Sequence, residues 1–258
     1  MTKIIAVTNQ KGGVGKTTTS VNLAASLAAT KRKSLLIDLD PQGNATMGSG
    51  VEKKTVAGSS YDVLLGEKEL EHCLIREESV GYDLLPGNAD LTGAEVGLLE
   101  VNSPEVRLRD ALQAVRQEYA YIIIDCPPSL NMLTVNALVA ADAVVIPTQC
   151  EYYALEGLSG LLETINKIQK FLNPKLKIEG LLRTMFDSRN NLANEVSQQL
   201  LEYFGDKVYQ TIIPRNVRLA EAPSHGLPVI TYDKSSAGAL AYLSLAGELM
   251  RKEALNDF

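Results

Sequence analysis

The stretch "NQKGGVGKTTT", Asn9–Thr19, decides the fold. It follows the apolar run "KIIAVT" and leads into an amphipathic segment, Thr17–Ala29, so we expect a strand, a glycine-rich loop and a helix in that order. In that context the pattern GxxxxGK followed by Ser or Thr binds phosphate. One feature goes beyond the pattern: a phosphate loop needs the lysine at its end, Lys16, and this chain carries a second one, Lys11, in front of the glycines.

The loop predicts a nucleotide site. Glycines let the backbone fold around phosphate oxygens, so that N–H groups and the start of the helix face the negative charge. We expect Lys16 to reach the β- and γ-phosphates and Thr17 to bind Mg²⁺. The predicted nucleotide-binding loop consists of Lys11, Gly12, Gly13, Val14, Gly15, Lys16, Thr17 and Thr18.

The rest of the chain alternates short β-rich runs with longer helical patterns. This alternation predicts an α/β fold with a twisted, mostly parallel sheet and helices on both faces, the P-loop NTPase architecture, in one domain covering residues 1–258. The further strands are expected to begin at Ser34, Tyr82, Tyr121, Ala143, Lys177 and Val208. The further helices are expected over Pro104–Glu118, Leu155–Phe171 and Leu192–Phe204.

Two predicted strands end in carboxylates. "YIIIDCPPS" ends in Asp125, which is typical of a Walker B aspartate that holds Mg²⁺ directly or through water. "LLIDLDPQGN" places Asp38 and Asp40 on the same side of a strand end. We expect Asp40 to orient the attacking water and Asp38 to support Mg²⁺ or Thr17. The alternative is that the pair caps a turn ahead of Pro41.

Composition narrows the class of protein. The net charge of −6 and pI of about 5.1 exclude a generally basic, nucleic-acid-coating protein, so any DNA contact must come from a local patch. The apolar runs are too short to cross a bilayer and Met1 leads directly into a strand, which predicts a cytoplasmic protein without a membrane anchor. The three cysteines have no disulfide or zinc spacing, so reduced thiols are expected at Cys73, Cys126 and Cys150.

The order from Lys11 to Thr18 is the deviant Walker A motif, and the chain resembles the ParA/MinD ATPases, in particular the short chromosomal ParA (Soj) type. The resemblance runs the full length. It is carried by "NQKGGVGKTTTSVNLAASLA", "LLIDLDPQGNAT", "IIIDCPPSL", "EYYALEGLSGL" and "IPRNVRLAEAPSHGLPV".

The resemblance implies a use for the second lysine. In this family the front lysine projects into the nucleotide of a partner subunit, so ATP is sandwiched in a face-to-face homodimer, and Lys11 would act in trans beside Lys16 and Asp40 in catalysis. Gly12 would let the partner's loop approach closely, and Glu151 would lie near the interface. The loop that borders adenine and ribose would be Pro214, Arg215 and Asn216.

Partners follow from the same resemblance. ATP-bound dimers of this type bind DNA without sequence preference, and a ParB-type centromere-binding protein stimulates hydrolysis and release, so nucleoid association is expected. Operator-specific repression is not expected, because the chain begins at the first strand without an amino-terminal helix-turn-helix. Arg189 and Arg218 match basic positions that the family uses on DNA. Weaker candidates are Lys207, Arg215 and Arg251.

Three alternatives remain open. A MinD-like membrane ATPase would need a cationic amphipathic tail, whereas "AGELMRKEALNDF" offsets its cations with Glu248, Glu253 and Asp257. A metabolic enzyme of the dethiobiotin-synthetase or nitrogenase-iron-protein type would need a small substrate or a cluster, and no second cysteine accompanies Cys126 in a comparable loop. A non-hydrolysing DNA clamp or filament would not need Asp40, because a protein that only binds ATP has no attacking water to orient.

Overall fold

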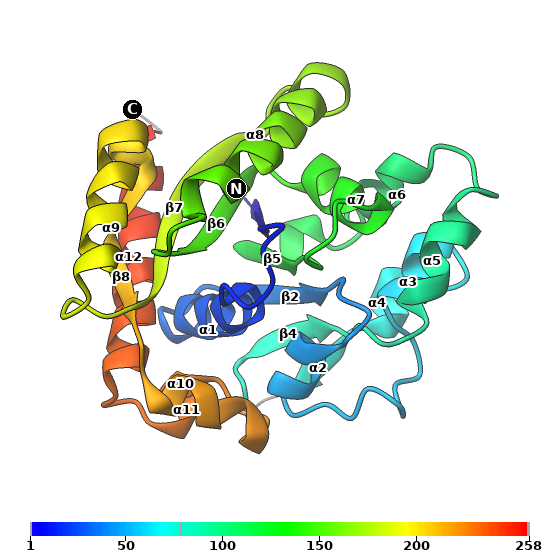
Figure 1. Cartoon of the computed structure of the whole chain (residues 1–258). Coiled ribbons are helices and arrows are strands. Elements are labelled where there is room, and N and C mark those ends of the chain that lie inside the picture. Colours follow the sequence, from blue (N-terminus) through cyan, green and yellow to red (C-terminus); the bar gives the residue numbers. More distant parts are fainter. Residues whose placement is uncertain (1, 78, 257–258) are drawn as a thin grey trace.

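One sheet runs through the residues that the computed structural model describes, 2–77 and 79–256 (Figure 1). Its strand order is β3-β4-β2-β5-β1-β6-β7-β8, with β3 antiparallel to β4 and the other pairs of this described part parallel. The strands are β1 (Lys3–Val7), β2 (Ser34–Asp38), β3 (Ile75–Glu77), β4 (Tyr82–Leu85), β5 (Tyr121–Asp125), β6 (Ala143–Gln149), β7 (Lys177–Phe186) and β8 (Val208–Pro214). The predicted fold class is confirmed.

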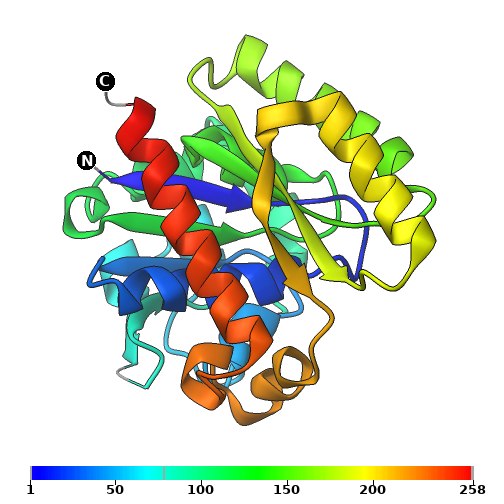
Figure 2. The same ribbon diagram turned by 90° about the vertical axis from the view of Figure 1, so that its left-hand side faces the viewer.

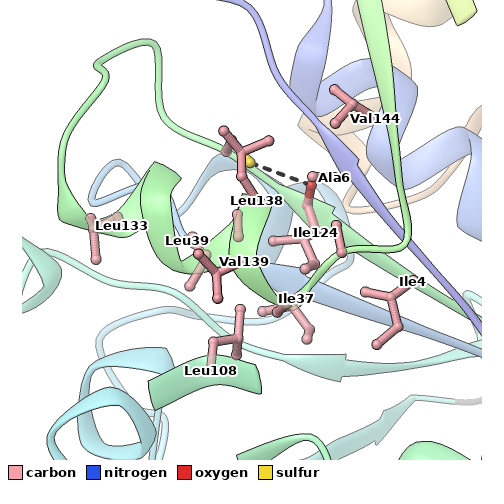
Figure 3. Packing of buried hydrophobic residues seen from close by; sticks show 14 of the residues in the cluster. Ile4, Ala6, Ile37, Leu39, Leu108, Ile124, Leu133, Leu138, Val139 and Val144 are labelled. Atoms are coloured by element: carbon pink, nitrogen blue, oxygen red, sulfur yellow. Dashed lines mark hydrogen bonds between the residues drawn. The ribbon is translucent and has the colours of Figure 1, made fainter. Parts of the chain in front are cut away.

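Helices cover both faces because the central strands are apolar on both. Along β5, Ile122 and Ile124 enter one core, while Tyr121 and Ile123 enter the other. Figure 3 shows Ile124 of the first core packed among residues of neighbouring elements. The second core is covered by α1 (Lys16–Ala29), α2 (Asn44–Gly48), α10 (Val217–Glu221), α11 (Val229–Tyr232) and α12 (Ala237–Asn256), and Figure 2 looks onto this face, where α12 crosses the strands.

The first core is covered by the helices that lie between α2 and β8 in the sequence. They are α3 (Ser60–Leu65), α4 (Leu70–Cys73), α5 (Leu91–Leu98), α6 (Arg107–Ala111), α7 (Met132–Ala140), α8 (Ala154–Phe171) and α9 (Asn191–Phe204). Short 3₁₀ turns complete the chain: η1 (Pro104–Val106), η2 (Arg116–Glu118), η3 (Gly205–Lys207) and η4 (Ala222–His225). All three cysteines are buried and unpaired.

The predicted helix over Pro104–Glu118 is wrong. The structure divides this segment into η1, α6 and η2. The cause is a side chain from α7: Asn136 Nδ2 donates to the Pro104 carbonyl, 2.8 Å, and its Oδ1 accepts from Leu108 N, 3.1 Å. In a continuous helix these two backbone groups would bond each other, so the amide of Asn136 occupies the place of one helical hydrogen bond.

Two other predictions of the sequence need comment. The short strand β3 was not expected, and it joins the sheet as an antiparallel edge beside β4. In the tail "AGELMRKEALNDF", Asp257 lies outside the described residues, so the charge balance there concerns α12 as far as Asn256. No helix among the described residues is both long and apolar enough to span a bilayer.

The sheet brings the polar motifs together. Because parallel strands point the same way, the carboxyl ends of β1, β2 and β5 meet at one edge, with Val7 and Asp38 both paired to Asp125. The phosphate loop follows β1 at this edge. The fold therefore places the loop, Asp125 and the Asp38–Asp40 segment beside one another.

One close contact joins the segment after α2 to the end of η4. Gly50 and Gly226 both have left-handed backbone conformations, with φ of +80° and +64°. A Cβ atom on Gly226 would lie 2.6 Å from the Cα atom of Gly50, far inside van der Waals contact. Backbone therefore packs directly on backbone at this point, and a side chain has no room.

We expect Gly226→Ala to lower the free energy of unfolding by about 3 kcal/mol, because it adds left-handed strain to a backbone clash. Gly81→Ala is the matched control: Gly81 has φ +79°, but its added Cβ would meet Ala28 at an ordinary 4.0 Å. The control should cost about 1 kcal/mol. Urea unfolding measures both, and equal losses would contradict the contact.

Candidate nucleotide-binding site

A cavity of about 530 Å³ opens at the carboxyl edge of the sheet. Its walls include the phosphate loop, Asp40 and the segment after β8, which are far apart in the sequence. Of the predicted nucleotide-binding residues, those that line it are Gly12, Gly13, Gly15, Lys16, Thr17, Thr18, Pro214, Arg215 and Asn216. Its size suits a small-molecule ligand.

The phosphate loop is held from both sides. Lys16 is buried and its Nζ donates to the Lys11 carbonyl, 3.1 Å, so the ammonium lies over the loop. Burial lowers the pKa of Lys16, and the charges of Asp125 and Asp40 partly offset this shift. Val14 does not line the cavity; its side chain is buried and its carbonyl accepts a hydrogen bond of 2.8 Å from Thr184 Oγ1.

Asp125 is a fully buried acid of the site, as is Asp38. Its carboxylate accepts from Thr17 Oγ1 and lies 2.8 Å from Ser20 Oγ, so it ties β5 to the first turns of α1. Burial and, after it, the nearby charge of Asp38 raise the pKa of Asp125 to about 8, against the lowering effect of the two hydroxyl groups. A carboxylate in this environment is stabilised by a cation.

The oxygens around Asp125 fit Mg²⁺. A threonine hydroxyl and a carboxylate are ligands that this ion prefers, and it commonly completes its shell with phosphate oxygens and water. In the described part of the chain no three His, Cys, Asp or Glu side chains converge as a protein-only metal centre. Thr17 and Asp125 would therefore hold Mg²⁺ together with a nucleotide.

Asp38 and Asp40 have different surroundings. The Asp38 carboxylate is fully buried and accepts from Thr46 N, Thr46 Oγ1 and Asp40 N, with burial raising its pKa to about 6. Asp40 lines the cavity, and one of its oxygens accepts from Gln42 N, 2.9 Å. These contacts hold the backbone of the Asp40 loop, and the role of Asp38 toward Mg²⁺ or Thr17 stays a prediction.

Lys11 points away from the cavity. Its Nζ binds Glu151 Oε2 at 2.5 Å, in the loop after β6, and both side chains are partly exposed, at 37% and 46%. The next residues, Tyr152 and Tyr153, are 75% and 64% exposed and contact each other edge to face. Neither tyrosine therefore packs in the core.

Sequence reasoning missed part of the cavity wall. Thr184 and Met185, near the end of β7, line it, and Met185 has a left-handed backbone with φ +49°. A non-glycine residue in that conformation is strained and is frequent at functional sites. The signal was available, because ligands of parallel sheets bind at the carboxyl ends of strands and "RTMFDSRN" covers such an end. Ser20 and Thr46 gave no signal beyond their polarity.

The predicted DNA-binding arginines are exposed and paired. Arg189 makes a two-pronged contact with Asp187, whose pKa falls to about 2 mainly through these hydrogen bonds. Arg218 pairs with Glu221 at 2.7 Å and with Asp233 at 3.4 Å. Arg215 also acts on Asp187, which places it near Arg189 at the ends of β7 and β8. Lys207, at the end of η3, and Arg251, in α12, are exposed.

A phosphate loop after the first strand of a parallel sheet, beside a buried acidic strand end, defines a P-loop nucleoside triphosphatase. A family model described as "AAA domain" matches residues 2–178. The chain is 57% identical to the sporulation initiation inhibitor protein Soj of Bacillus subtilis, covering 96% of this chain and 98% of that protein. The chain belongs to the ParA/MinD family of ATPases.

Two further proteins are similar to this chain over nearly its whole length. The chromosome partitioning protein ParA of Myxococcus xanthus is 53% identical, over 97% of this chain and 89% of that protein. Among solved structures, cobyrinic acid a,c-diamide synthase from Mycobacterium smegmatis, with bound ADP and magnesium, is 40% identical. It has a TM-score of 0.86 and covers 97% of this chain and 95% of its own. The similarity to partitioning ATPases therefore spans nearly the whole chain.

We expect Asp125→Asn to stabilise the metal-free protein at about pH 8 by roughly 1–3 kcal/mol. Because the pKa of Asp125 is higher in the folded protein than in the unfolded chain, the native protein loses stability as pH rises from about 4 to about 8. The gain of the variant should shrink toward acidic pH. Urea unfolding with a chelator measures it.

The control is Asp142→Asn, which removes a partly exposed carboxylate that binds Arg116 and Ile4 N at the opposite edge of the sheet. This variant should lose stability at neutral pH. A gain for Asp125→Asn that stayed constant with pH would contradict the buried-charge explanation.

Proposed function

We propose that this protein is an ATP-dependent DNA-partitioning switch. Mg²⁺-ATP closes a homodimer around two nucleotides, the dimer binds DNA without sequence preference, and hydrolysis stimulated by a ParB-type centromere-binding protein releases it. Residues 1–258 act as one ATPase domain that works on the nucleoid in the cytoplasm. Near full-length similarity to chromosome partitioning proteins supports this function.

The direction of Lys11 is the observation that carries the proposal. Lys11 leaves its own cavity and lies on an exposed surface with Glu151 and two exposed tyrosines. A cation there cannot serve the nucleotide of its own subunit without turning back. It can serve the nucleotide of a second copy docked on that surface, where its charge would stabilise the transferred phosphoryl group.

The remaining residues divide the chemistry. The loop from Gly12 to Thr18 would surround the phosphates, with Lys16 as the cation of the same subunit. Thr17 and Asp125 would hold Mg²⁺, and Asp40, which lines the cavity, would orient the attacking water. Pro214, Arg215 and Asn216 would border the base and ribose.

DNA contact is proposed at the ends of β7 and β8. Arg189, Arg215 and Arg218 lie in or beside the loops there, and each subunit alone offers few cations because Asp187 and Glu221 neutralise part of the charge. Dimerisation would double the number of phosphate contacts. This explains how a protein with a net charge of −6 can bind DNA only when ATP is bound.

The synthase among the similar structures favours a second candidate, an ATP-dependent enzyme acting on a small acid. Such an enzyme would hydrolyse ATP when its acid and amine substrates are present. A partitioning switch would hydrolyse ATP slowly until DNA and the centromere-binding partner are added. A MinD-like function would instead require lipid binding, which liposome sedimentation with ATP detects.

We expect the Asp40→Ala substitution to abolish ATP turnover. The variant protein should still dimerise when Mg²⁺-ATP is added, so its mass should double from 27.9 kDa. Adding Lys11→Ala should keep that protein monomeric, because the cross-subunit cation is lost. Light scattering after size exclusion measures the mass. The matched control is Lys170→Ala, an exposed lysine on α8, which should still dimerise. Equal masses with and without Lys11 would refute the trans role.

We expect Arg189→Ala and Arg218→Ala each to weaken DNA binding by the ATP-loaded dimer and to lower the salt dependence of log K by about 2, one phosphate per subunit. Fluorescence anisotropy over a fourfold range of salt measures this. The control is Arg109→Ala, an exposed arginine on α6 that pairs with its neighbour Asp110 as Arg189 pairs with Asp187. Binding that ignored salt would contradict phosphate contact.

A further inference from the structure

Two irregularities interrupt the pairing of β7 with β8. Leu181 pairs with Val208 and Arg183 pairs with Ile212, so a step of two residues along β7 matches a step of four along β8. From there to the Phe186–Pro214 pair, three residues of β7 match two of β8. Each strand therefore carries a bulge, first β8 and then β7, just before both strands reach the cavity.

The bulges aim residues at the cavity. The β7 bulge contains Met185 with its left-handed backbone, and Thr184 and Met185 line the cavity. The β8 bulge lies before Ile212, and the next two residues, Ile213 and Pro214, line the same cavity. Bulges are frequent beside active sites because they turn side chains that a regular strand would point elsewhere.

Two buried charges hold the β8 bulge from opposite sides. From β7, the Arg183 guanidinium donates to the carbonyls of Tyr209 and Gln210, at 2.8 and 3.3 Å, and to Ser197 Oγ of α9. From α12, the Glu248 carboxylate accepts from Gln210 N and Thr211 N, at 2.8 and 2.9 Å. Figures 1 and 2 show β8 between α9 and α12.

This arrangement is costly for stability alone. Arg183 is 6% and Glu248 7% exposed, burial lowers the pKa of Arg183, and its Nε has no hydrogen-bond partner within the described residues. A regular β8 would pair its own backbone groups and would need neither charge. The bulge and its two buried charges are therefore better explained by the cavity-lining residues that they position than by stability.

We propose that Arg183 and Glu248 are positioning residues that set the base-side wall of the nucleotide cavity, Met185 and Pro214–Asn216, and so its preference for adenine. They do this without touching the nucleotide. The inference rests on the proposed function in one respect, that the cavity takes ATP. The phosphate loop is tied to β7 through the hydrogen bond from Thr184 Oγ1 to the Val14 carbonyl, in which neither Arg183 nor Glu248 takes part, so the two charges should matter more for the base than for the phosphates.

The test compares Mg²⁺ complexes of ATP, CTP and tripolyphosphate, which has the phosphates without a nucleoside. We expect Arg183→Met to weaken ATP binding about tenfold and to reduce the preference for ATP over CTP, with tripolyphosphate changed less than about twofold. Glu248→Gln, which keeps one acceptor, should show the same pattern to a smaller extent. Isothermal titration of the full chain measures all three ligands.

The control is Asp142→Asn, which removes a carboxylate that accepts from a backbone N–H at the far edge of the sheet. It should leave all three affinities unchanged. Equal losses for ATP and tripolyphosphate, or an unchanged preference for ATP over CTP in a folded variant, would overturn the positioning role. If Arg183→Met fails to fold, Glu248→Gln decides. A native protein that bound ATP no better than tripolyphosphate would instead refute the ATP assignment itself.

Discussion

The buried carboxylate of Asp125 is the constraint around which the site is built. It ends the central strand β5, receives the Thr17 hydroxyl from the phosphate loop and lies beside Asp38 of β2. An acid in this position is costly without a cation, which explains why hydroxyl donors and a lysine surround it. Because of this cost, binding of Mg²⁺ with a nucleotide should stabilise the fold: the cation offsets the free-energy cost of burying the Asp125 carboxylate.

The far wall of the cavity depends on a different interaction. Thr184 holds the Val14 carbonyl and so joins the end of β7 to the phosphate loop. Behind this contact, Arg183 and Glu248 fix the adjoining bulge of β8. The phosphate half of the site is thus set by a local loop, whereas the base half is set by buried charges brought from β7 and α12.

Much of this could be predicted from the sequence because the signals are local. The strand, glycine loop and helix around Lys16 are contiguous, and apolar runs separated by amphipathic segments specify a parallel sheet with two covered faces. The predicted helix over Pro104–Glu118 failed for the opposite reason. Its interruption comes from Asn136, a residue of another helix, and no pattern within the segment reports that contact. The strand β3 was equally hidden, since three residues are too few for a periodic signal.

The sequence by itself determined the fold class, the phosphate loop and the acids at the strand ends, since each depends on residues adjacent in the chain. Only the tertiary structure decided how those acids divide their roles. Asp38 is held by Thr46, while Asp40 faces the cavity. The structure also decided that Lys11 turns outward to Glu151 and that Thr184 and Met185 complete the wall. The Lys11 and Thr184 contacts join residues more than a hundred positions apart, whereas the Asp38–Thr46 contact spans eight residues and forms where α2 packs beside β2. Such pairings arise when the sheet and its helices are assembled.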